Sequence, residues 1–165
     1  MPAPRFGNPR LDDIFCYWLS KRRGEHPPLR ANIRQSELDA AVRHLKIIDE
    51  EREPGKPLQF RHRLIGTHNI EWLGRDYTSQ MLDENLYGAA APALVASFIR
   101  FVEEALPYHR RTRMDWNYQK FIPHESVELP LSDETHKVSI IPRGGVFRLA
   151  VAGDRTQEIF EPTAV

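Results

Sequence analysis

The sequence predicts a single α+β domain built on one antiparallel sheet. The chain has 165 residues, which is enough for one domain with a substantial core. Apolar residues recur at helical spacing near the N-terminus and again after residue 92, whereas residues 45–66 alternate as strands do. Because the predicted strands lie before and after the helices rather than between them, we expect an antiparallel sheet with helices on one face.

The first predicted element is an amphipathic helix that follows a loose arm, residues 1–10. Its apolar positions are spaced i, i+3, i+4, i+7 and i+8, and Gly24 with the Pro27-Pro28 pair ends it. An apolar face this strong on about three turns of helix must pack on the domain or on a second copy of the chain. We expect a homodimer or partner interface here. Its side chains are Leu11, Ile14, Phe15, Trp18 and Leu19.

Two strands are predicted next. Residues 45–50 and 58–66 have strand-like apolar patterns, and the run Pro54-Gly55-Lys56-Pro57 between them is typical of a turn. Strands joined by so short a connection favour an antiparallel hairpin.

Period-two alternation decides which side chains share a face of the second strand. Phe60, His62 and Leu64 fall on one face, and Arg61 and Arg63 fall on the other. We expect the two arginines to form solvated salt bridges on the sheet surface, worth about 0–1 kcal/mol each.

The longest predicted helix begins at Pro92 and ends before Pro107. Residues 112–131 and 136–151 predict two long strands joined by a polar turn. The basic run at residues 109–113 is interpreted as a solvated helix end, where cations complement the helix dipole.

Four motifs carry a family resemblance. The run Phe60-Arg61-His62-Arg63-Leu64-Ile65-Gly66-Thr67 leads into Gly74-Arg75-Asp76-Tyr77-Thr78. Tyr17-Trp18 lies in the first helix, and Leu129-Pro130-Leu131-Ser132-Asp133 ends a late strand. Together, over residues 11–145, they resemble the signature of a bacterial family of small stand-alone PAS-like proteins.

The resemblance implies a PAS-like fold and a sensory or regulatory role, with no common ligand and no catalytic residue. The prolines after the first helix and the polar C-terminal residues divide the chain into an N-terminal arm and helix (1–28), a PAS-like domain (29–152) and a C-terminal tail (153–165). Two residues depart from the family's pattern, because Ser79 stands where glycine is usual and His62 where an aromatic residue is more common.

In a PAS fold, the strand face that carries His62 lines a cavity between sheet and helices. An apolar lining with a few polar groups would suit a small, largely apolar or aromatic ligand. His62 has two other interpretations: a core histidine bonded to a neighbour, or an axial ligand of haem. The residues of the expected pocket are Phe60, His62, Leu64, Trp72, Tyr77, Leu94, Phe98 and Phe101.

Composition and motifs argue against several other classes. The 23 basic and 23 acidic side chains cancel, so no overall field attracts nucleic acid. We find no apolar run near the roughly 20 residues of a membrane span, no Gly-x-Ser-x-Gly elbow and no metal-ligand spacing. The single cysteine, Cys16, fits a reducing cytoplasm.

We therefore expect a non-catalytic, cytoplasmic sensory module without a metal site, a nucleic-acid partner or membrane insertion. It would bind a small molecule in its cavity and signal through a partner protein. The first alternative is a ligand-free interaction adaptor, whose interior is filled by its own side chains. The second is a haem-based sensor that uses His62; the sequence leaves the cofactor unknown.

Overall fold

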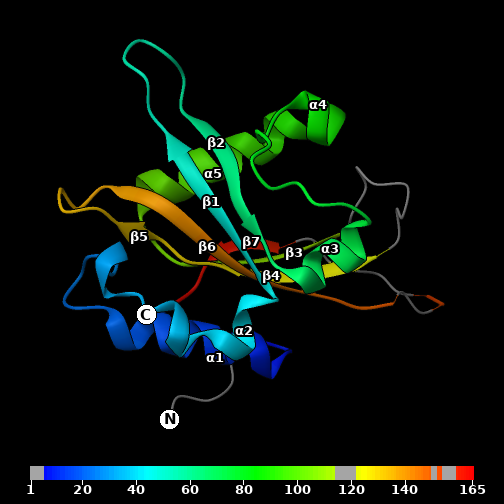
Figure 1. Cartoon of the computed structure of the whole chain (residues 1–165), viewed down its shortest axis with the longest axis horizontal. Helices are drawn as coiled ribbons and strands as arrows, with labels where there is room; N and C mark the ends of the chain where they lie inside the picture. Colours follow the sequence, from blue (N-terminus) through cyan, green and yellow to red (C-terminus); the bar gives the residue numbers. More distant parts are fainter. Residues whose placement is uncertain (1–5, 114–121, 150–151, 154–158) are drawn as a thin grey trace.

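The centre of the fold is a seven-stranded sheet in which all pairings are antiparallel (Figure 1). A computed structural model describes residues 6–113, 122–149, 152–153 and 159–165. The strand order is β2-β1-β6-β4-β3-β7, and β5 also pairs with β6. The predicted α+β class is confirmed. The strands are β1 (Leu45–Glu51), β2 (Gln59–Ile65), β3 (Tyr108–Arg113), β4 (Pro123–Glu128), β5 (Leu131–Ser132), β6 (Val138–Phe147) and β7 (Ile159–Pro162).

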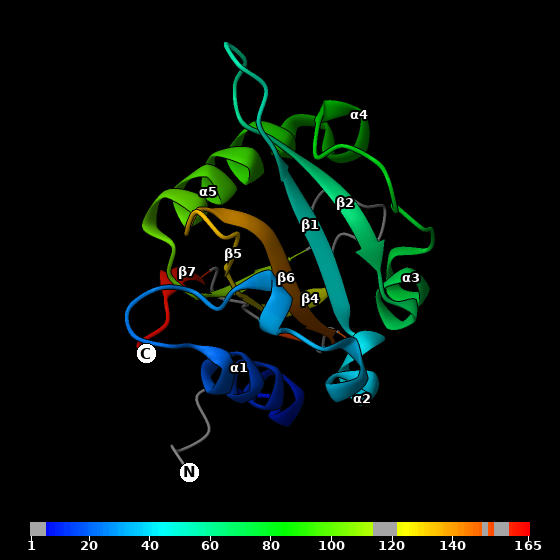
Figure 2. The same ribbon diagram turned by 60° about the vertical axis from the view of Figure 1, so that its left-hand side comes forward.

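The predicted PAS-like arrangement is confirmed: helices cover one face of the sheet, and the N-terminal amphipathic helix that precedes the domain packs on the other. Figure 2 shows α5 and α1 on opposite sides of the strands. We call the side under α3, α4 and α5 the inner face, and the side under α1 and α2 the outer face. The helices are α1 (Pro9–Lys21), α2 (Asp39–Val42), α3 (Thr67–Leu73), α4 (Glu84–Tyr87) and α5 (Ala91–Glu104), with short 3-10 turns at Arg30–Asn32, Gln35–Glu37 and Gly88–Ala90.

Each face has its own hydrophobic core. The sheet is therefore apolar on both sides, which gives β1 and β6 a nearly continuous buried pattern rather than a strict alternation. The inner core includes Ile48, Phe60, Ile65, Leu73, Tyr77, Phe98, Phe101, Tyr108 and Ile141. The outer core includes Leu11, Ile14, Phe15, Trp18, Leu45, Val127, Leu129, Leu131 and Ile140.

The amphipathic face of α1 packs on the outer face of its own sheet. Leu11, Ile14, Phe15 and Trp18 are buried there, and Leu19 packs partly against the same core. The approach is close, because a Cβ on Gly144 of β6 would lie 2.7 Å from Ile14 Cδ1. The expectation that these five side chains form a dimer or partner interface is corrected, since the chain itself covers them. Homodimerisation stays a prediction.

A β-bulge moves one predicted pocket residue to the other face. In the pairing of β1 with β2, Ile47 lies opposite Leu64 but Ile48 lies opposite His62, so Arg63 is the extra residue. Phe60 and His62 therefore face the inner core, whereas Leu64 faces outward. The regular alternation predicted for this strand is wrong at Leu64, which lines an apolar hollow of about 90 Å³ on the outer face.

Two further predictions about the second half are corrected. The basic run at residues 109–113 belongs to strand β3 and not to a helix end. The predicted strand at residues 112–131 is replaced by β4 and β5, with residues 114–121 outside the described part. At the C-terminus, Ile159–Pro162 of the expected polar tail pairs with β3 as strand β7.

One stretch, Glu84–Glu104, is long and apolar enough by composition to cross a membrane, which corrects the expectation that no apolar run approaches that length. In the structure it forms α4, a 3-10 turn and α5. Phe98, Phe101 and Val102 are buried in the inner core. Core helices of globular proteins pass the same compositional test, and the packing of α5 on the sheet accounts for its apolar character.

Candidate functional site

The inner face brings together most of the residues predicted to form a pocket. Phe60, His62, Tyr77, Phe98 and Phe101 are all buried in the inner core. This grouping follows from the fold, because β2 belongs to the sheet and α5 belongs to the layer of helices that packs on the inner face.

Three predicted pocket residues lie elsewhere. Leu94 of α5 is only partly buried, at the edge of the inner core. Trp72 of α3 is half-buried and stacks on Phe147 of β6, with ring centroids 5.6 Å apart. Leu64 faces the outer side because of the bulge.

His62 takes part in a buried aromatic cluster. Its Nε2 lies 2.8 Å from the hydroxyl of Tyr87, and its ring centroid is 6.3 Å from that of Tyr77. Burial lowers the pKa of His62 to about 3, with help from the cations Lys46 and Arg143, so the imidazole is neutral at pH 7. Its Nδ1 is buried and has no hydrogen-bond partner in the described part of the chain.

A row of buried charges crosses the inner face beside this cluster. Lys46 of β1 lies opposite Arg143 of β6, and Arg143 lies opposite Glu128 of β4. Lys46 is 4% exposed, Arg143 7% and Glu128 0%. Charged side chains are almost never buried this deeply unless they are paired, so this row marks an unusual site within the core.

Arg110 of β3 completes the ion pairs. Its Nε and Nη2 donate to the two Glu128 oxygens at 2.6 and 3.2 Å, and Nη2 also donates to Ser97 Oγ at 2.8 Å. The guanidinium lies 4.1 Å from the Phe160 ring centroid. Burial alone would raise the pKa of Glu128, but Arg110 and Arg143 hold it below its usual value.

His124 and Asn69 are two further buried polar residues of the inner face, and together with Lys46, Glu128 and Arg143 they form what we call the polar strip. His124 Nε2 and Asn69 Oδ1 are both buried, and no described residue forms a hydrogen bond with either atom. Gly145 leaves room for this arrangement, because a Cβ there would lie 2.6 Å from His124 Nε2. Burial lowers the pKa of His124 well below its usual value, and nearby Lys46 and Arg143 lower it further. These buried polar atoms need partners that the described residues do not supply.

Sequence reasoning missed this strip. Charged residues in strands were assigned to solvated faces, and no motif marks Lys46, Glu128 or Arg143. One signal was available: Lys46 lies two residues from Ile48, and Arg143 two residues from Ile141, so alternation places each charge on the face of a core residue.

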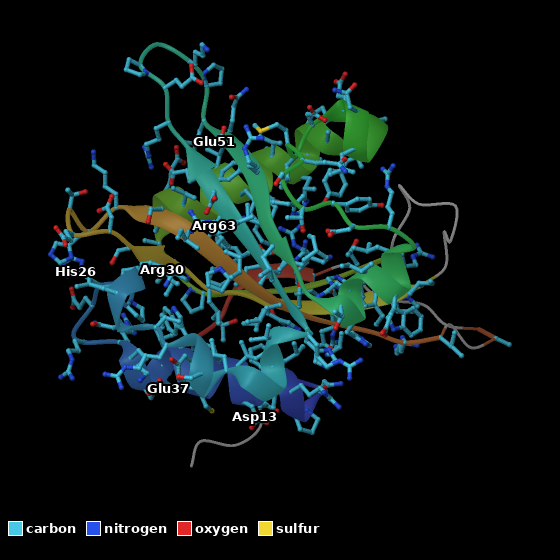
Figure 3. The ribbon with its side chains drawn as sticks, viewed as in Figure 1. Asp13, His26, Arg30, Glu37, Glu51 and Arg63 are labelled. Atoms are coloured by element: carbon cyan, nitrogen blue, oxygen red, sulfur yellow. The ribbon has the colours of Figure 1, made fainter. Side chains whose placement is uncertain are left out.

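The arginines of β2 behave as predicted. Arg61 pairs with Glu51, and Arg63 Nε lies 2.8 Å from Asp49. Figure 3 shows Arg63 and Glu51 on the β1–β2 hairpin. The four side chains are at least partly exposed, so these pairs are surface salt bridges of small energetic weight.

The turn after α3 positions Tyr77 against His62. Gly74 ends α3 in the left-handed region at φ 77°. Asp76 Oδ1 accepts hydrogen bonds from the amide and the hydroxyl of Thr78, which fixes the turn. Ser79 has φ 69°, a conformation that glycine adopts at less cost, and its amide donates to the His62 carbonyl at 2.7 Å.

The histidine pKa leads to a prediction about acid stability. An unfolded histidine has a pKa near 6.5, and in the fold that of His62 is about 3. The unfolded chain binds a proton at His62 more readily than the folded chain does. The contribution of His62 to the free energy of unfolding is therefore present above pH 6.5 and is lost as the pH falls. We expect His62 to account for a loss of about 3 kcal/mol between pH 6.5 and 4.

Urea unfolding at several pH values measures this. The glutamine of His62→Gln cannot titrate but can still form a hydrogen bond with Tyr87. In this variant the free energy of unfolding should fall by about 3 kcal/mol less between pH 6.5 and 4 than it does in the wild type. An unchanged pH dependence in the variant would show that His62 is protonated in the fold.

Among the residues that the structure describes, these groups do not form a cluster of metal ligands. Within residues 6–113, 122–149, 152–153 and 159–165, no three His, Cys, Asp or Glu side chains are grouped to hold a metal ion. The arrangement can instead hold a molecule by charge and hydrogen bonds, because it offers buried donors and acceptors among aromatic rings.

Comparison with known proteins agrees with the predicted fold. A search of curated proteins found no match to this chain. A family model described as PAS domain matches residues 7–142. The matched region contains α1 and strands β1 to β5 and extends into the first half of β6. PAS domains are generally non-catalytic sensory or regulatory modules. The chain belongs to the PAS domain family.

Proposed function

We propose that this chain is a non-catalytic sensory module that binds a small molecule at the inner face and signals through a partner protein. One observation carries the proposal: His62 Nδ1, His124 Nε2 and Asn69 Oδ1 are buried and have no hydrogen-bond partner among the residues that the structure describes. Leaving a buried polar group unpaired costs about 1–3 kcal/mol. A ligand that bonds to them would remove this cost.

The geometry of β6 supports a route for the signal. Arg143 points to the inner face beside Glu128, and the next residue, Gly144, contacts Ile14 of α1 on the outer face. A shift of β6 caused by a ligand would therefore change the packing of α1. A partner protein that reads the position of α1 would receive the signal without any catalytic step.

Native mass spectrometry of the full chain, beside its denatured mass, tests the proposal. We expect an additional non-covalent mass that His62→Ala reduces and the matched Leu64→Ala, on the opposite face of β2, preserves. A bare mass in every preparation, with no small molecule taken up on addition, would favour the ligand-free adaptor. The same spectrum reports whether the chain is a homodimer.

The haem alternative makes a different prediction for the same sample. An axial bond from His62 Nε2 to iron would require the 2.8 Å contact with Tyr87 to be given up. We therefore expect a colourless protein without a Soret band. A red-brown preparation whose Soret band is lost in His62→Ala would establish haem as the ligand instead.

A further inference from the structure

The inner face holds more positive than negative charge. Lys46, Arg110 and Arg143 are buried or nearly so, and Glu128 is the one carboxylate paired with them among the residues that the structure describes. Lys46 and Arg143 lie directly opposite each other on β1 and β6. Like charges in that position destabilise a sheet, so the fold alone gives no reason for this pair.

Glu128 does not have the capacity to neutralise the row. Arg110 takes both of its oxygens through Nε and Nη2. Arg143 uses only its Nε, which lies 3.2 Å from Glu128 Oε1 and donates to Ser126 Oγ at 3.0 Å. Both Nη groups of Arg143 therefore remain without a hydrogen bond to any residue in the described segments.

Lys46 is even less satisfied. Its ammonium forms no ion pair or hydrogen bond with the described part of the chain, and lies 5.5 Å above the Phe147 ring centroid. Burial lowers its pKa and Arg143 lowers it further. His62 and His124 both experience Lys46 and Arg143 as nearby charges, so both imidazoles lie in the neighbourhood of these two cations.

We propose that the ligand of the inner face is a small organic acid whose carboxylate is held by Lys46 and Arg143; this inference rests on the proposed function. A guanidinium binds a carboxylate in a planar, two-bond geometry, and the free Nη groups of Arg143 offer it. A neutral ligand would leave the cations uncompensated. The rings of Phe60, Tyr77 and Phe147 favour an organic body over inorganic phosphate.

Binding to the full chain by calorimetry tests this inference. The probes are benzoate, phenylacetate, succinate and citrate, each compared with its uncharged amide, together with inorganic phosphate, all at one ionic strength. We expect at least one acid to bind, with its amide at least tenfold weaker. In Lys46→Met, which keeps the length of the side chain, the same acid should bind at least tenfold more weakly.

Two controls separate recognition from folding. Lys46→Met removes a buried unpaired charge and should leave the unliganded protein as stable as the wild type or more so. Lys56→Met replaces an exposed lysine of the β1–β2 turn, already paired with Glu53, and should bind the acid as the wild type does.

The outcomes distinguish the two proposals. Amides that bind as well as acids, or acids that bind Lys46→Met as well as wild type, would overturn the organic-acid inference and leave a small-molecule sensor standing. Binding of phosphate alone would also overturn it. If no acid and no amide binds and native mass spectra show a bare chain, the proposed function fails as well.

Discussion

Replacing Glu128 with glutamine is expected to destabilise the protein by about 3–5 kcal/mol, the cost typical of removing one partner of a buried ion pair. Glu128 is fully buried and its oxygens contact both Arg110 and Arg143. The amide keeps the shape but leaves two guanidinium groups in the core without an anion. Urea unfolding at pH 7 measures the loss, which is a large part of the 5–15 kcal/mol that usually holds a domain together.

The same substitution on the same strand gives a matched control. Glu125 is one of the neighbouring carboxylates of β4, and it faces the outer side, where it pairs with His109 and Arg111. Its partly exposed pairs should be worth about 1 kcal/mol or less. Equal losses of stability in Glu125→Gln and Glu128→Gln would mean that the ion pairs of Glu128 are as well solvated as those of Glu125 on the outer face.

A double variant tests whether repulsion among the cations is the cause. With Glu128 removed, Lys46 and Arg143 face each other with no anion beside them. Adding Lys46→Met to Glu128→Gln removes one of these charges, so Lys46→Met should raise the stability more in the Glu128→Gln background than in the wild type. If the two substitutions are simply additive, Lys46 does not interact with this row.

The elements with strong periodicity could be predicted from the sequence, and His62 shows why. Alternation placed His62 on the face of Phe60, and both are buried in the inner core. Leu64 could not be placed in this way, because a single extra residue reverses the face of everything after it. Nothing in the run 60–67 marks the bulge, which depends on the pairing with β1.

The buried charges could not be predicted for a different reason. A lysine in a strand is usually solvated, and only the three-dimensional register brings Lys46, Arg143 and Glu128 into one row. The basic run at 109–113 also could not be divided between the two faces from the sequence. In β3, Arg110 pairs with Glu128 on the inner face. His109 and Arg111 pair with Glu125 on the outer face.

For α1, the sequence predicted an apolar face but not what covers it. Spacing shows that Ile14 and Trp18 must be buried, and it cannot show whether the partner is the same chain or another. The structure answers through Gly144, whose missing side chain lets Ile14 approach the sheet. The Gly144-Gly145 pair of β6 therefore serves close packing, of Gly144 against Ile14 and of Gly145 against His124.

Trp18→Glu is expected to destabilise the chain by at least 4 kcal/mol. Truncating a buried Trp or Phe costs about 3–5 kcal/mol, and the new carboxylate would be buried without a partner. The indole Nε1 also donates to the Pro130 carbonyl at 2.8 Å, which would lose its donor. Urea unfolding and light scattering on the same samples measure stability and mass together.

Tyr17→Phe provides the comparison, because Tyr17 is the neighbouring residue on the more exposed side of α1. It removes a hydroxyl that donates to Glu37 at 2.8 Å and accepts from the Arg34 amide at 3.1 Å, so a loss of about 1–2 kcal/mol is expected. If Trp18→Glu instead kept wild-type stability and converted a dimer to a monomer, the face of α1 would be an interface between chains. A large loss of stability with unchanged mass of the folded fraction would show that α1 belongs to the fold of one chain, where a displacement of β6 can reach it.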